Sequence, residues 1–178
     1  MTQTESFADP TLAFDAFDRN ARVNAATLDD LTDEMLGFPD DTGGFSVGQH
    51  LADMVSFRRD WLSRVAPAYA ERVPDPTDVD HPTWLRARTI ADLRADFDAG
   101  DAAVRAAVAD HVADGRPFEG VYESHPAALL LHCVVHDAHH RGQIAALVRR
   151  SGRSEERRHA LEGRTWSCLL YTSDAADE

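Results

Sequence analysis

Apolar residues recur at steps of three and four along four long stretches of the chain, which is the spacing of one face of an α-helix. The first stretch opens at Asp9-Pro10, where a capping residue precedes a proline in the first turn. Its periodic positions continue to Met35, and Gly37 and Pro39 then end it. This pattern predicts a single long helix at the start of the chain.

The other three stretches also carry recognisable ends. Ser46 is followed three residues later by Gln49, which is a capping box, so the second helix begins there and ends or kinks at Pro67. The third helix covers residues 89–114, from a threonine cap to an Asp-Gly stop. The fourth covers residues 126–151 and is opened by a proline.

No stretch shows the alternation of a β-strand, and the proline-rich residues 73–84 indicate a long crossover connection. We therefore predict an all-α four-helix bundle with a long crossover connection. The 178 residues, 43% of them hydrophobic, suit one domain with a full core. Gly100 would let a neighbour approach closely, and we expect Asn20 and Asn24, on the apolar face of the first helix, at the edge of the core.

The chain has 31 acidic residues against 18 basic ones, all arginine, and a formal net charge of −13. A nucleic-acid-binding protein normally has a basic excess or a basic stripe, so we expect no nucleic-acid partner. The longest apolar run, residues 127–131, is too short to span a bilayer, and the N-terminus has no secretory signal, so we expect no membrane partner. The contexts of Cys133 and Cys168 are unlike a disulfide framework, which favours a cytoplasmic setting.

The last eleven residues, CLLYTSDAADE at 168–178, match the in-frame translation of a transposase-type sequencing adapter. A match of this length is hard to assign to chance. We therefore interpret residues 168–178 as a non-native tail and expect the single domain to occupy residues 1–167.

Histidines of the fourth helix carry the candidate chemistry. His132, His136 and His140 are spaced by four residues, so they project from one helix face in consecutive turns. A pair at this spacing can direct two ring nitrogens at one metal ion, and imidazole suits zinc or nickel. Burying unpaired imidazoles on an apolar face costs free energy unless something binds them. For any single histidine, a packing role at the edge of the core is the alternative.

His50, one turn into the second helix, faces the same bundle interior and is the best candidate for a third ligand. Three protein ligands and one open position are typical of catalytic metal sites. A divalent ion held by His50, His136 and His140 would lower the pKa of a bound water to about 7, which makes a nucleophile or base near neutral pH.

Two segments, SVGQHLADMVSFRRDWL at 46–62 and HCVVHDAHHRGQIAALVRR at 132–150, resemble the DinB/YfiT-like family of metal-binding four-helix bundles. The resemblance extends over nearly all of residues 10–166, and its most specific parts are H-x-x-x-H-R-G-Q from position 136 and H-L-A-D from position 50. It implies a divalent metal on the three histidines, a homodimer and a small-molecule substrate. Characterised relatives are transferases and isomerases that use a low-molecular-weight thiol such as bacillithiol, mycothiol or glutathione.

Two further residues are predicted to take part in catalysis. Asp53, one turn after His50, is expected to accept a proton from a histidine ring or from an incoming thiol. Gln143, about one turn after His140, is expected to orient a ring or a bound water. A solvated position on a helix flank is the alternative for both. Exposed positions are expected for Arg141 and His139.

Other interpretations of the motif stay open. The H-D-x-x-H at 136–140 is close to the zincin motif H-E-x-x-H, but the shorter aspartate would sit farther from the metal and no strand-bearing subdomain precedes it. His136-Asp137 also matches the ligand doublet of HD-type phosphohydrolases, although adjacent side chains diverge on an ordinary helix. A dimeric bundle with a structural metal, or a stress-associated binding protein without turnover, is the non-enzymatic alternative.

Overall fold

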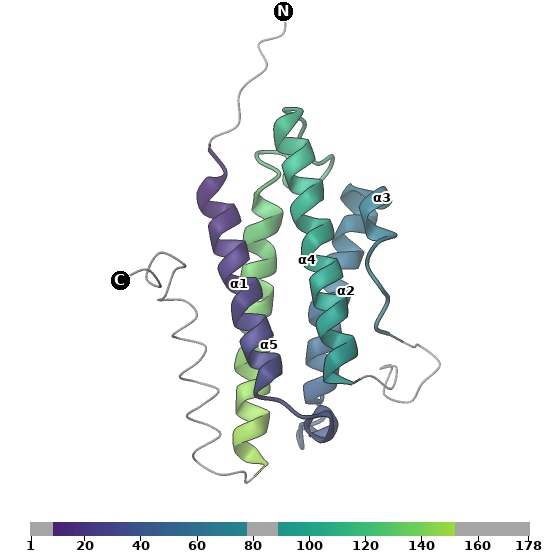
Figure 1. The fold of residues 1–178 in the computed structure, drawn as a ribbon, viewed down its shortest axis with the longest axis vertical. Helices are drawn as coiled ribbons and strands as arrows, with labels where there is room; N and C mark the ends of the chain where they lie inside the picture. Colours follow the sequence, from purple (N-terminus) through teal and green to yellow (C-terminus); the bar gives the residue numbers. More distant parts are fainter. Residues whose placement is uncertain (1–8, 78–88, 152–178) are drawn as a thin grey trace, which may run out of the picture.

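The computed structural model describes residues 9–77 and 89–151. The segment 168–178, interpreted as a tail, lies outside the described residues. No strand occurs in the described residues, and the prediction of an all-α bundle is confirmed (Figure 1). A 3-10 helix, η1 (Asp33–Gly37), and a short helix, α3 (Pro67–Ala70), accompany the long helices. The four long helices are α1 (Thr11–Asp29), α2 (Val47–Val65), α4 (Ile90–Ala113) and α5 (Ala128–Arg150).

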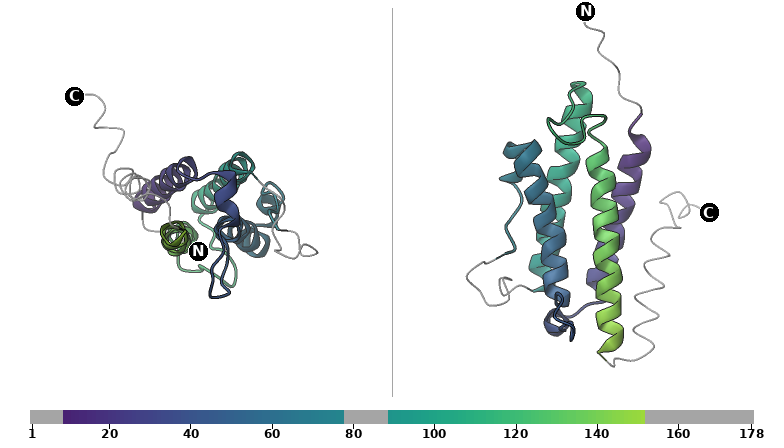
Figure 2. Two further views of the ribbon diagram at one scale, coloured as in Figure 1. Left: turned by 90° about the horizontal axis from the view of Figure 1, so that it is seen from below. Right: turned by 180° about the vertical axis from the view of Figure 1, so that it is seen from behind.

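The long helices lie side by side, with α5 packed against α1 and α2, and α2 packed also against α4 (Figures 1 and 2). α2 and α4 run in the same direction, and α1 and α5 run in the opposite one. Two neighbouring helices that run the same way need a connection that returns along the bundle. α3 lies at the opposite end of the bundle from the start of α4, which agrees with the predicted long crossover connection (Figure 1); residues 78–88 of that connection lie outside the described part.

Capping side chains fix where α2 and α4 begin, as predicted. The Ser46 hydroxyl accepts the Gln49 backbone N–H at 3.3 Å, and the Gln49 side chain accepts the Ser46 N–H at 2.8 Å. Thr89 and Asp92 form the same reciprocal pair at the start of α4. Each pair satisfies two N–H groups that a helix leaves without partners. The cap of α2 places His50 in its first turn.

The first helix is shorter than the sequence predicted, because α1 ends at Asp29 and does not continue to Met35. The N–H of Asp30 bonds back to carbonyls of the last helical turn. Aspartate and threonine side chains in this stretch compete for the backbone and weaken the helix. Leu31 and Met35 are nevertheless buried, because η1 closes that end of the bundle (Figure 1).

A buried group of polar side chains, which we call the polar cluster, joins all four long helices. Arg58 of α2 is completely buried and binds both oxygens of Asp137 of α5 at 3.0 and 2.7 Å. Its Nε donates to Asp101 of α4 at 2.6 Å. Asn20 and Asn24 of α1 donate to Asp137 Oδ2 at 2.6 and 2.7 Å. The expectation that these asparagines lie at the edge of the core is wrong, because a buried carboxylate needs donors around it.

Candidate metal centre

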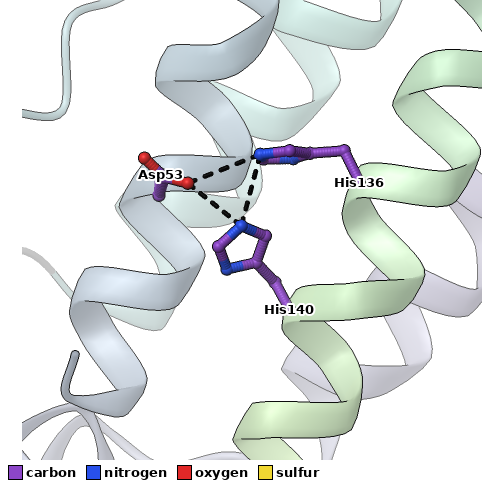
Figure 3. A group of neighbouring side chains, drawn as sticks. All are labelled: Asp53, His136 and His140. Carbon is purple, nitrogen blue, oxygen red and sulfur yellow. Dashed lines mark hydrogen bonds and ion pairs between the residues drawn. The ribbon is translucent and has the colours of Figure 1, made fainter. Parts of the chain in front are cut away.

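Asp53 of α2 and two histidines of α5, His136 and His140, direct one atom each at a common point (Figure 3). Asp53 Oδ2 lies 3.0 Å from His140 Nε2 and 3.4 Å from His136 Nε2. The two histidine nitrogens are 3.2 Å apart. The four-residue spacing on α5 puts both rings on the side that faces α2. We call these three residues the metal cluster.

These separations match those of ligands that share one divalent ion. Zinc bonds to histidine nitrogen and carboxylate oxygen measure about 2.0–2.2 Å, so two ligands of a tetrahedral ion lie about 3.3 Å apart. The observed separations of 3.0, 3.2 and 3.4 Å surround this value. Two imidazoles and one carboxylate are also a donor set that zinc accepts, and imidazole suits nickel. The side chains therefore fit a divalent ion that keeps a coordination position open.

His50 lies beside the metal cluster but does not share its common point. Its Nδ1 is 2.9 Å from the Nδ1 of His140, whereas the Nε2 of His140 faces Asp53. If His140 holds an ion through Nε2, its Nδ1–H can donate to His50. Burial and the neighbouring His140 lower the pKa of His50 to about 4, so its ring is neutral and can accept this bond. His50 as a direct ligand stays a prediction, and Asp53 is the third residue that shares the common point with His136 and His140.

Asp53 and His136 shift each other's pKa in opposite directions. Burial raises the pKa of Asp53, but hydrogen bonds with His136 and His140 outweigh it and hold this pKa well below its usual range. Burial lowers the pKa of His136, but the carboxylates of Asp137 and Asp53 raise it, and the net direction is upward. Asp53 is therefore ionised at neutral pH, which favours a cation beside it. Its side chain is 34% exposed, so solvent reaches the metal cluster from this side.

Asp137, next to His136 in the sequence, does not belong to the metal cluster. Its carboxylate is fully buried in the polar cluster, and Oδ1 lies 3.9 Å from His136 Nδ1. Burial raises its pKa, but Arg58 and the hydrogen-bond donors around it hold the pKa well below its usual range. A zincin base or an HD-type ligand would need this carboxylate at the metal. The geometry favours neither alternative.

The other residues singled out on α5 differ in their surroundings. His139 is exposed, as predicted. Gln143 is exposed too, and within the described ranges no hydrogen bond joins it to the metal cluster. The expectation of an exposed Arg141 is wrong, because its guanidinium donates to the side-chain oxygens of Asn20 and Asn24 at 2.7 and 2.5 Å. These oxygens need a donor once both amides are buried.

Phe57 of α2 completes the surroundings of His136. Its ring stacks on the imidazole with 3.9 Å between centroids and 21° between planes. The contact covers one face of His136 and restrains its rotation. Sequence reasoning missed Phe57, although its position four residues after Asp53, on the same helix face, is a signal that could have found it.

A helical bundle with two helix-borne histidines and one carboxylate at a common point has the features of a metal-binding four-helix bundle. In the described part of the chain, no helix is long and apolar enough to cross a membrane. Residues 1–166 match the DinB family, and the chain belongs to this family. No curated protein and no solved structure matches the chain.

Proposed function

We propose that this protein is a metal-dependent enzyme that activates a low-molecular-weight thiol, or water, for transfer, isomerisation or hydrolysis of a small substrate. The observation that carries the proposal is the metal cluster, whose ligand separations suit one divalent ion such as zinc or nickel. When bound, the ion supplies the Lewis acidity that lowers the pKa of a thiol or a water. The thiol, of the bacillithiol, mycothiol or glutathione class, comes from the family resemblance alone.

The side chains around the ion have separate tasks. His136 and His140 offer the lone pairs of Nε2, and Asp53 contributes negative charge through Oδ2. His50 accepts the Nδ1–H of His140 and so fixes the tautomer of that ring. A thiol or a water can reach the ion from the exposed side of Asp53. Oδ1 of Asp53, the oxygen that does not face the histidines, can accept the proton that the thiol releases. A contact between Gln143 and a bound ligand stays a prediction.

We also propose a cytoplasmic homodimer. The family resemblance supports the dimer and the contexts of the cysteines support the compartment. Leu131 and Val135, four residues apart on α5, are 47% and 68% exposed and offer an apolar strip that a second copy would cover. Sedimentation of wild type and Val135→Glu tests this, because a charge in that strip should shift a dimer to monomer. A wild-type monomer would refute the homodimer.

Metal content tests the site, in protein purified without a nickel column. Wild type should carry a divalent ion, and His136→Ala and Asp53→Ala should lose it. His50→Ala separates the two roles of His50. If His50 only orients His140, affinity should fall about 10- to 100-fold and excess metal should restore binding; if His50 is a ligand, the loss should match that of His136→Ala. Equal metal content in wild type and His136→Ala would refute the metal cluster.

Thiol activation is tested on a cobalt-substituted sample. Glutathione should change the visible spectrum of the bound cobalt, because thiolate ligation alters the d–d bands and adds charge-transfer absorption. A metal that neither small thiols nor chelators reach without unfolding would instead support a structural metal in a non-catalytic protein.

A further inference from the structure

A row of ring side chains leads away from the metal cluster along α2 and α5. The His132 ring lies 4.8 Å from Phe57 and 5.4 Å from Trp61, measured between centroids. Tyr122, in the connection between α4 and α5, lies 5.6 Å from Trp61. All four rings are only partly buried. The ring row, as we call these four residues, is therefore a surface that a ligand can reach.

Tyr122 and His132 form a fixed pair within the ring row. Tyr122 has a φ of 55°, a left-handed conformation that residues other than glycine rarely adopt and that is enriched at functional sites. Its hydroxyl lies 2.5 Å from His132 Nδ1. A hydroxyl that donates to Nδ1 of a neutral imidazole leaves the ring proton on Nε2. His132 then presents an N–H donor that has no partner among the described residues.

Arg64 adds a positive charge at the end of the ring row, 5.1 Å from the centroid of the Trp61 ring. It has no acidic partner in the part of the chain that the structure describes. Arg64 also lines a separate hollow of about 450 Å³ with Arg116 and Glu119, to which no residue of the ring row contributes. At least six of the twelve described arginines, in contrast, form an ion pair with an aspartate: Arg19, Arg58, Arg94, Arg105, Arg116 and Arg150.

We propose that the ring row and Arg64 bind the body of the substrate, an aromatic or similarly apolar group that carries a carboxylate. The apolar group lies on Trp61 and Phe57, while the carboxylate accepts from His132 Nε2 and pairs with Arg64. Phe57 also stacks on His136, so the far end of the bound molecule points to the metal cluster. This orientation rests on the proposed function, whereas the binding itself does not. α2 rises by about 16 Å from Asp53 to Arg64, which sets the length of a molecule that reaches both ends.

Phenylacetate is the probe, and the fluorescence of Trp61 is the signal, in a full-length protein with Trp84 and Trp166 replaced by phenylalanine. Metal-free protein is titrated first, so that the carboxylate cannot bind an ion. We expect a saturable change with phenylacetate and a much weaker response to acetate, which has only the charge, and to benzyl alcohol, which has only the ring. Arg64→Gln should weaken binding about three- to fivefold, as expected for an exposed ion pair.

Arg72→Gln is the matched control, because Arg72 stacks on Tyr69 of α3 instead, with 4.5 Å to the ring centroid. Tyr122→Phe should weaken binding and change the ¹⁵N signals of His132, since only the hydroxyl is removed. Arg64→Gln should keep the metal content of wild type, so a failure of the metal site and a failure of this inference are separate results. The inference is overturned if phenylacetate gives no saturable signal, if acetate binds as well, or if Arg64→Gln and Arg72→Gln respond alike.

Discussion

Gly100 of α4 offers the sharpest test of the polar cluster. A Cβ at this position would lie 2.8 Å from Cδ of Arg58, whereas ordinary contacts begin at 3.4 Å, so Arg58 would have to move by about 0.6 Å. It cannot move freely, because Asp101 holds its Nε and Asp137 holds both terminal nitrogens. Alanine would raise the free energy of unfolding by about 1 kcal/mol through its higher helix propensity. Overpacking would lower it by about 1–3 kcal/mol, and weakening the buried ion pair would lower it further. We expect Gly100→Ala to lower the free energy of unfolding by about 1–3 kcal/mol.

Gly142 of α5 is the matched control, since it is helical and exposed and an added Cβ would meet nothing within 4 Å. Gly142→Ala should raise the free energy of unfolding by about 0.5–1 kcal/mol. Urea unfolding of metal-free protein, followed by far-UV circular dichroism, should separate the two variants by about 1.5–4 kcal/mol. A Gly100→Ala protein as stable as wild type would refute the reasoning that Arg58 is fixed in place.

Three further outcomes are expected. Asn24→Ala removes a buried hydrogen bond to a charged group, Asp137, and should cost about 2–3 kcal/mol in the same urea assay; a neutral change would contradict the polar cluster. Burial raises the pKa of Cys133 to about 12, so a thiol reagent such as DTNB should label Cys168→Ser protein only as fast as it unfolds; rapid labelling in native buffer would contradict this. Burial and a neighbouring histidine lower the pKa of His50 from 6.5 to about 4. As the pH falls through 6.5, the unfolded chain therefore binds a proton that the folded chain does not bind. The free energy of unfolding should consequently decrease towards pH 4. His50→Gln should flatten this dependence in metal-free protein, and an unchanged slope would count against it.

Local signals explain what could be predicted. The capping residues Ser46 and Thr89 act within one turn of backbone, and the spacing of His136 and His140 is a property of one helix. The place of Asp53 is different, because it depends on how α2 is rotated against α5. Asp53 lies three residues after His50, so both face the same side of α2 and periodicity alone does not decide which one reaches Nε2 of His140.

The buried polar residues could not be predicted from their own positions. Asn20, Asn24 and Arg141 each look like ordinary polar residues on a helix flank when they are read singly. Their burial follows from Asp137, which needs donors, and from the two asparagine oxygens, which then need Arg141. This chain of donors and acceptors joins α1 to α5, and only the tertiary arrangement reveals it.

The H-D-x-x-H motif has residues on two faces of α5: His136 and His140 lie in the metal cluster, and Asp137 lies in the polar cluster. One residue along a helix turns the side chain by about 100°, so while His136 faces α2 and the solvent side, Asp137 faces the core. There it binds α1 and α2 at once, and Arg58 extends the connection to Asp101 of α4. Ligands of one ion must be held to within about 0.5 Å, and packing of apolar side chains alone tolerates small rotations of a helix. The directional bonds of Asp137 restrict that rotation, so the polar cluster holds the histidines of α5 against Asp53 of α2.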